Sequence, residues 1–111
     1  MWTAQKLRRV ADRYMRDSCD RESPPQVNEL AALLGLSRSR FSRLFAQLVG
    51  EPPSAYLRRR QIARAKHLLR TTDLTTNTIA YRCGYSTRST LFHAFKQATG
   101  ITPKKYRARV R

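Results

Sequence analysis

The 111-residue sequence predicts an all-α fold of two helix-turn-helix lobes joined by a long connecting helix. Leu30–Ser37 aligns with Ile79–Ser86 and Arg38–Arg59 aligns with Arg88–Arg109, with Thr87 inserted between the blocks. The aligned pairs include two glycines, a proline and two aromatic residues, which indicates a duplicated module. Two copies are too few for a solenoid, which needs about three repeats to bury a continuous core. The expected parts are an N-terminal lobe, a connecting helix and a C-terminal lobe: residues 1–52, 53–71 and 72–111.

The first lobe is expected to open with a helix over about residues 3–17. Apolar residues recur there at i, i+3, i+4, i+7 and i+8, which places them on one face: Leu7, Val10, Ala11, Tyr14 and Met15. Ser18–Gln26 contains two consecutive prolines and is expected to be a loop. A short helix over about Val27–Leu34 follows, and Gly35 supplies the left-handed residue that favours a helix end.

Each lobe then contains a helix with an apolar inner face and a polar outer face. Ser37 is a suitable N-cap for the first of these helices, and Gly50 and Gly100 are expected to end the two. A basic, hydroxyl-rich helix directly after a short helix and a glycine turn is typical of a recognition helix that enters the major groove. The predicted inner faces consist of Phe41, Leu44, Phe45 and Leu48, and of Leu91, Ala94, Phe95 and Ala98.

The connecting helix is predicted over about Pro53–Thr71, where no helix-breaking residue interrupts the chain. About 19 residues at about 1.5 Å each make it about 28 Å long. That length is comparable with the roughly 34 Å of one DNA turn, so the helix can hold two reading helices at successive major-groove segments. Thr102 is a plausible cap for a last helix at the C-terminus.

The charge of the chain points to a polyanionic partner. The sequence has 23 Lys and Arg against 7 Asp and Glu, a net charge of +16, and every acidic residue precedes residue 74. Nucleic acid and an anionic membrane surface can both offset such a charge. No apolar run approaches the roughly 20 residues that span a bilayer and no apolar signal core follows the N-terminus, so we expect a cytoplasmic protein without a membrane role.

The residues do not predict an enzyme or a cofactor. There is no nucleophile motif, no Gly-rich phosphate loop and no pair of carboxylates in the basic half, and the two histidines, His67 and His93, lie on different predicted helices. Cys19 and Cys83 lack the spacing of a zinc site, so no metal is expected. We expect Cys83 to be a small buried core residue.

The segment IAYRCGYSTRSTLFHAFKQATGITPKKYR, Ile79–Arg107, resembles the signature segment of AraC/XylS-type transcription regulators. The resemblance covers about residues 5–107 of the chain and includes VNELAALLGLSRSRFSRLFAQLVGEPPSAYLRRRQIARAKHLLR before that segment. It implies a seven-helix DNA-binding domain with two lobes, which binds promoter DNA and helps recruit RNA polymerase, so we expect an activator. Its specific spacing involves Gly84, Tyr85, Leu91, Phe95, Lys96, Gly100, Pro103 and Tyr106.

The resemblance also implies which residues read DNA bases. Arg43 is the strongest candidate, because a guanidinium can bond the O6 and N7 of one guanine together. Phe92 stands where the family more often has a small polar residue, and it either touches a thymine methyl or folds back on the lobe. His93 stands where arginine is frequent, and it either reads a base or only covers the helix end or touches a phosphate. The full set is Arg38, Ser39, Arg40, Ser42 and Arg43, with Arg88, Ser89, Thr90, Phe92 and His93.

A second set of residues is expected to bind phosphates. Two of them, Ser37 and Ser86, are expected at helix N-termini, whose backbone N–H groups favour anions. The set is Ser37, Arg59, Lys66, Ser86, Thr87, Lys96, Lys104 and Lys105. Arg58, Arg60, Arg64, Arg107 and Arg109 can add to it collectively.

Two other functional classes stay open beside a specific regulator. A non-specific nucleic-acid-binding protein, of nucleoid or RNA-binding type, uses the same charge without sequence choice. An adaptor whose basic face meets an acidic protein predicts no DNA footprint. The chain shows no sensor region, so it is either a stand-alone regulator that binds DNA as a monomer or the C-terminal part of a longer sensor protein.

Overall fold

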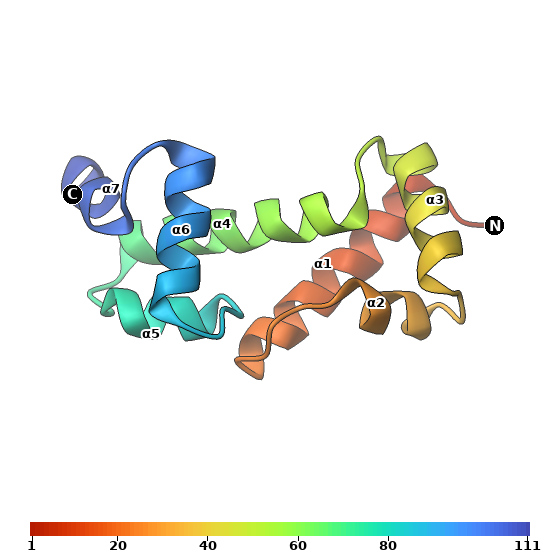
Figure 1. Cartoon of the computed structure of the whole chain (residues 1–111), viewed down its shortest axis with the longest axis horizontal. Coiled ribbons are helices and arrows are strands. Elements are labelled where there is room, and N and C mark those ends of the chain that lie inside the picture. The colour runs from red at the N-terminus through yellow and green to blue at the C-terminus, as the bar shows by residue number, and fades with distance from the viewer.

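A computed structural model describes residues 1–111, which form seven helices and no strand. Figure 1 shows α4 running along the molecule between two groups of helices, α1 to α3 at one end and α5 to α7 at the other. The predicted all-α fold, with two helix-turn-helix lobes and a long connecting helix, is confirmed. The helices are α1 (Ala4–Asp20), α2 (Val27–Leu33), α3 (Arg38–Val49), α4 (Pro53–Thr71), α5 (Thr76–Arg82), α6 (Arg88–Thr99) and α7 (Pro103–Val110).

Helix α1 is longer than predicted. It starts after the N-cap Thr3, whose side chain accepts a hydrogen bond from the Lys6 backbone, and it ends at Asp20 instead of Asp17. The sequence predicts a loop from Ser18 onward, but Ser18 and Cys19 are helical and buried, because they extend the apolar face of the helix by one turn. The connecting loop therefore begins only after Asp20.

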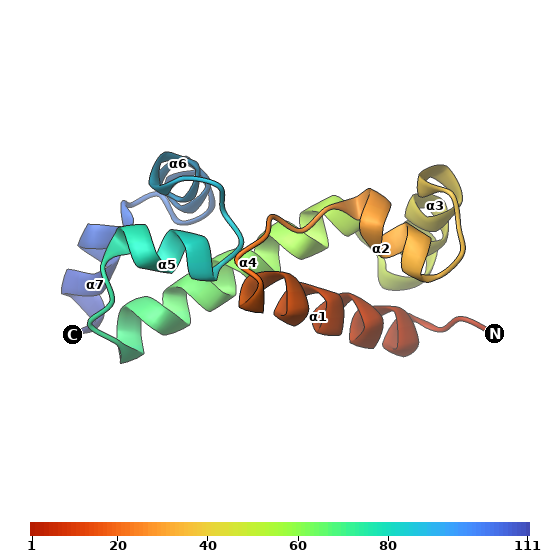
Figure 2. The same cartoon turned by 90° about the horizontal axis from the view of Figure 1, so that it is seen from below.

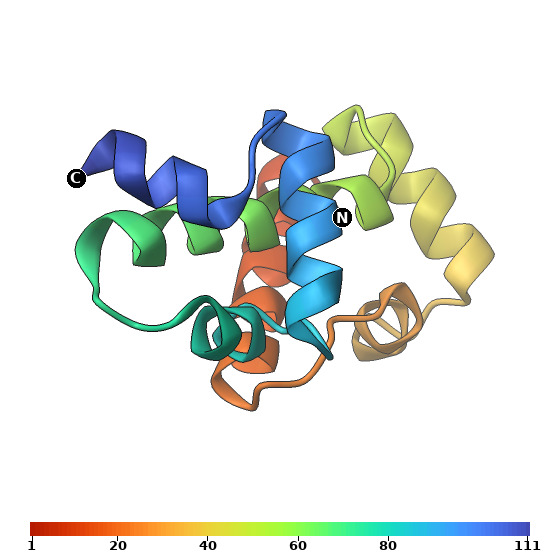
Figure 3. The same cartoon turned by 60° about the vertical axis from the view of Figure 1, so that its left-hand side comes forward.

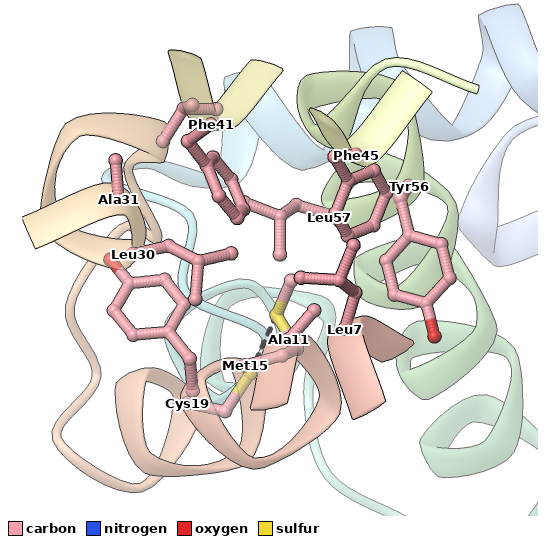
Figure 4. Packing of buried hydrophobic residues seen from close by; sticks show 12 residues of the cluster. Leu7, Ala11, Met15, Cys19, Leu30, Ala31, Phe41, Phe45, Tyr56 and Leu57 are labelled. Carbon is pink, nitrogen blue, oxygen red and sulfur yellow. Dashed lines mark hydrogen bonds between the residues drawn. The ribbon is translucent and has the colours of Figure 1, made fainter. Parts of the chain in front are cut away.

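The apolar side chains form two separate cores, one in each lobe. Leu57 is the last residue of α4 in the first core and Ile62 is the first in the second. Figure 4 shows Leu7, Leu30, Phe41 and Phe45 converging around Leu57. The lobes repeat one aromatic contact: Phe45 and Tyr56 have ring centroids 5.4 Å apart at 70°, and Phe95 and Tyr106 have the same separation and angle. The duplicated sequence therefore builds duplicated packing.

The predicted inner faces of α3 and α6 need a correction at their last position. Leu48 and Ala98 are exposed. Val49 packs against the first core in place of Leu48, because it lies one further turn along the same face as Phe45. At the equivalent position of α6, Thr99 is half-buried and donates a hydrogen bond to the Phe95 carbonyl at 2.8 Å.

Helix α6 begins at Arg88, but its N-cap is one residue after the expected Ser86. The predicted N-terminal residue Ser86 does not cap it; Thr87 does, accepting a hydrogen bond from the Thr90 backbone N–H at 3.1 Å. The insertion of Thr87 into the second copy of the repeat moves the cap past Ser86. In the first copy the cap is Ser37, as predicted, and it accepts from the Arg40 backbone N–H at 3.2 Å.

Helices α3 and α6 lie on the same side of the molecule. Figure 2 shows both of them in its upper part and α1 in its lower part, and Figure 1 shows them running in the same direction near the two ends of the molecule. The molecule measures 45 × 25 × 21 Å, so its long axis separates the two helices. Each lobe holds its helix through the buried face, which leaves the opposite face exposed: Phe41 and Phe45 are buried in α3, and Leu91 and Phe95 in α6.

Candidate nucleic-acid interface

The outer face of α3 carries uncompensated positive charge. Arg38, Arg40 and Arg43 are exposed, and none of them forms an ion pair or a side-chain hydrogen bond within the protein. Ser39 between them is exposed and Ser42 is half-buried. The three guanidinium groups therefore keep all their donors available for an external acceptor.

The outer face of α6 is less basic than that of α3. Arg88, Ser89 and His93 are exposed and Lys96 lies one turn beyond them. The His93 imidazole stands edge-on to the Phe92 ring, with the ring centroids 5.6 Å apart at 88°. The second lobe thus presents an imidazole and an aromatic ring where the first lobe presents Arg43 and Ser42.

Two predicted base-reading residues of α6 line cavities at opposite edges of the helix. Phe92 is 38% exposed and lines a cavity of about 330 Å³ together with Leu91 and Pro103. Thr90 lines a cavity of about 370 Å³ between the lobes, and its hydroxyl lies 2.9 Å from that of Thr87. Thr90 is therefore turned toward the first lobe and Phe92 toward α7, because the two positions are about 200° apart around the helix axis.

Acidic partners divide the basic residues of α4 into paired and unpaired ones. Arg59 lies 3.0 Å from Glu51, with its guanidinium over the Tyr56 ring, and Arg60 lies 3.3 Å from Asp12. The Arg59 pair is solvent-exposed and worth at most about 1 kcal/mol, so a phosphate can replace the carboxylate.

Arg58 differs from these neighbours because it has no acidic partner and lines the cavity between the lobes. Its position between the lobes makes it a further candidate for a phosphate. The sequence alone does not separate Arg58 from the other arginines of α4. No local signal separates them, since the difference comes from acidic residues on other elements.

The C-terminal basic residues are also divided. Lys104 and Lys105 are exposed in the first turn of α7, where Thr102 caps the helix by accepting from the Lys105 backbone N–H at 3.2 Å. In contrast, Arg107 donates to the carbonyls of Leu69 and Thr72 at 3.3 and 3.1 Å. Lys104 and Lys105 are therefore available to phosphates, whereas Arg107 ties α7 to the end of α4.

The two cysteines are buried, one in each core. Both are free thiols, with Cys19 2% and Cys83 0% exposed. Burial raises the pKa of Cys83 to about 12 and raises that of Cys19 as well, so the thiolate form is disfavoured. The expectation that Cys83 is a buried core residue is confirmed. No three His, Cys, Asp or Glu side chains gather as metal ligands, and none of the helices combines the length and apolar character needed to cross a bilayer.

The chain is similar to known DNA-binding regulators over most of its length. Residues 30–109 match the family model described as a helix-turn-helix domain. The chain is 40% identical over 86 residues to the transcriptional regulator AlkR of Acinetobacter baylyi and 34% identical over 82 residues to the xylose operon regulatory protein of Escherichia coli. These alignments cover 78% and 74% of this chain but only 28% and 21% of the two relatives, so the chain spans about a quarter of their length.

Solved structures share the whole arrangement of helices. The DNA-binding domain of AdpA, crystallised with a target DNA, has a TM-score of 0.84 and 30% identity, covering 95% of this chain and 92% of that one. The C-terminal domain of the response regulator yesN from Fusobacterium nucleatum has a TM-score of 0.82 and 29% identity, covering 93% and 95%. The structure described as the xylose-binding transcription activator xylR has a TM-score of 0.72 and 29% identity, covering 90% of this chain and 26% of that one.

Proposed function

Because this chain belongs to the AraC-type family of helix-turn-helix transcription regulators, we propose that it binds specific sequences of double-stranded DNA and inserts α3 and α6 into two successive major-groove segments. Proteins of this family are DNA-binding regulators and not enzymes. The solved relative AdpA, whose DNA-binding domain was crystallised with a target DNA, supports duplex DNA as the partner.

The observation that carries this proposal is the parallel placement of two exposed helices at equivalent positions of a repeat. Both lie on the same side of the molecule and run in the same direction, as Figures 1 and 2 show. Helix α4, with 19 residues, is about 28 Å long, close to the roughly 34 Å between equivalent points of the major groove on one face of the duplex. This geometry supports simultaneous reading by both helices.

We assign base reading mainly to α3, because its guanidinium groups are free and exposed. Arg43 is the principal residue, since a bidentate contact to guanine discriminates more strongly than a hydroxyl contact. In α6, His93 and Phe92 replace the arginine and the small side chain, so we propose weaker base selection by the second lobe. The other proposed base-reading residues are Arg38, Ser39, Arg40, Ser42, Arg88 and Ser89, with Thr90 at the margin of the interface.

Phosphate contacts are proposed to position both helices on the duplex. The cap hydroxyls of Ser37 and Thr87 mark the two helix N-termini, where backbone N–H groups and the helix dipole favour an anion. Ser86 is exposed beside the second of these. The proposed set is completed by Arg58, Arg59, Lys66, Lys96, Lys104 and Lys105.

We further propose that the bound protein activates transcription in the cytoplasm by contacting RNA polymerase, and that this chain binds its site as a monomer. The solved relative described as a transcription activator supports activation. The internal repeat supports monomeric binding, because the two equivalent helices of one chain can reach two groove segments without a second copy.

The net charge of +16 supports a second candidate, a basic protein that coats nucleic acid without sequence choice. Selection of bound sequences from a random duplex pool distinguishes the two functions. We expect two short motifs about ten base pairs apart and a preference of roughly 10³ or more over random duplex at physiological salt. A selected pool that shows no motif would refute the specific regulator and support the coating protein.

A further inference from the structure

The lobes are joined by more than α4. Their cores do not merge, because the core residues of α4 change from one cluster to the other between Leu57 and Ile62. Figures 2 and 3 both show the loop after α1 passing beside the turn between α5 and α6, so a segment of the first lobe reaches the second. Helix α1 also contacts α5, so the two lobes meet in this region as well as through α4.

Gly84 in the turn between α5 and α6 is closely covered by this loop. A Cβ atom on Gly84 would lie 3.0 Å from the Pro25 Cδ and 3.0 Å from the Ser23 carbonyl oxygen, closer than side-chain atoms normally approach. The repeat provides a comparison, because a Cβ atom on Gly35 would have no atom within 4 Å. Both glycines have a positive φ, +69° for Gly35 and +81° for Gly84. The positive φ therefore explains the glycine at both positions. Only at Gly84 does the absence of a side chain also make room for Ser23 and Pro25.

Polar contacts secure the same junction. The buried Gln61 of α4 donates from Nε2 to the Cys83 carbonyl at 3.0 Å. The Arg64 side chain of α4 donates from Nε to the Arg82 carbonyl at 3.0 Å, and its Nη2 lies 4.0 Å from Asp20 at the end of α1. Arg64 thus touches α1 of the first lobe and α5 of the second.

We propose that the contact of Ser23–Pro25 with Gly84, together with Gln61 and Arg64, is an interlobe brace that fixes α3 relative to α6 and so sets the spacing at which the protein accepts its two DNA motifs. The DNA part of this inference rests on the proposed function. Two linked binding modules bind DNA most tightly when their separation already matches that of the two sites, because binding then costs no free energy to order the modules. A loosened brace lowers the effective concentration of the second helix and lets it accept other spacings.

The orientation of the lobes can be tested without DNA. Spin labels on Gln47→Cys and Gln97→Cys, which are exposed and equivalent positions of α3 and α6, report the distribution of distances between the helices, while the buried native thiols stay unlabelled. We expect Gly84→Ala to broaden this distribution and Gly35→Ala to leave it as in the parent. Both variants place alanine at a positive φ, so strain in the turn is matched. Equal widths in the two variants would overturn the brace.

Two further variants guard against a misfolded Gly84→Ala. Adding Pro25→Ala removes the ring atom that would lie 3.0 Å from the new methyl group, and we expect the double variant to regain part of the parent's narrow distribution. If Gly84→Ala does not fold, Arg64→Gln is compared with Arg60→Gln, since Arg60 pairs with Asp12 of the first lobe and forms no ion pair or hydrogen bond with the second. Broadening by Arg64→Gln alone supports the brace, and identical widths refute it.

The DNA measurement uses duplexes with the selected spacing, with one base pair added or removed, and with one motif only. We expect Gly84→Ala to lose roughly tenfold in affinity at the selected spacing, to bind the single motif like Gly35→Ala, and to discriminate less among the spacings. The same spacing preference in both variants would refute the brace. Failure of the parent to select any site would refute the proposed function, and the spin-label distances would still decide the brace.

Discussion

Replacing Arg43 by alanine should remove sequence discrimination without weakening the fold. The Arg43 side chain is exposed and makes no internal ion pair or hydrogen bond, and it lies on the polar face of α3 opposite Phe41 and Phe45. An exposed helix position of this kind changes the free energy of unfolding by no more than about 0.5 kcal/mol. Any larger loss in DNA binding therefore belongs to the interface and not to the fold.

The loss of DNA affinity in Arg43→Ala shows whether Arg43 contacts a base or a phosphate, because the two contacts affect specific and non-specific affinity differently. A bidentate contact between a guanidinium and guanine contributes about 1–3 kcal/mol of discrimination, which corresponds to roughly 5-fold to 150-fold in the ratio of specific to non-specific affinity. Loss of a phosphate contact instead lowers the specific and the non-specific affinity alike. It also reduces the slope of log affinity against log salt concentration by about 0.9. We expect Arg43→Ala to lower the affinity for the selected duplex much more than the affinity for a scrambled one.

Fluorescence anisotropy titrations of both duplexes over a series of salt concentrations measure these quantities. Arg13→Ala is the matched control, because Arg13 is also exposed, forms no ion pair and lies on α1, outside both α3 and α6. Arg43→Lys keeps the charge but loses the bidentate geometry, so it should behave like alanine in the ratio of affinities. An equal loss on both duplexes for Arg43→Ala would show that Arg43 binds phosphate and would refute the base-reading role.

Three other predictions concern the elements that hold the reading helices. Thr87→Ala should lower the free energy of unfolding by about 1 kcal/mol and Ser86→Ala should leave it unchanged, because only Thr87 caps α6. Chemical denaturation measures both changes. A larger effect of Ser86→Ala would contradict the assignment of Thr87 as the cap. Phe95→Ala should cost about 3–5 kcal/mol in the same assay, since the ring is fully buried, and a cost below about 1 kcal/mol would contradict its place in the core. Burial, then the hydrogen bond of Tyr56 to Asp12 at 2.7 Å, raise the pKa of Tyr56 from 10.0 to about 12. The neutral phenol is favoured in the folded state, so its stabilisation is present below pH 10 and is lost as the pH rises through 12. Stability measured over this interval should fall less steeply in Tyr56→Phe than in the parent, and identical slopes would contradict the role of Tyr56.

Much of the fold was predictable because its signals are local. Pro53 at the start of α4 and the unbroken run after it predicted a helix over Pro53–Thr71, which is where the helix lies. The glycines at Gly50 and Gly100 ended α3 and α6 as expected. The sequence-based prediction is wrong at Ser18, where the periodic apolar pattern of α1 continues past a loop signal. It is also wrong at Leu48, where the apolar face of α3 continues through Val49 instead.

The helices, the glycine turns, the duplicated module and the family could be predicted from the sequence, because helix periodicity, caps and motif spacing depend on residues within a few turns of each other. Which basic residues are free depends instead on the tertiary structure. Arg58 and Arg59 are adjacent, yet Arg59 meets Glu51 and Arg58 faces the cavity between the lobes. The tertiary structure also makes Gly84 differ from its repeat partner Gly35, because the atoms that cover Gly84 come from a loop about sixty residues earlier in the chain. Pairing and close approach depend on how the lobes are placed, and a local pattern contains no information about that placement.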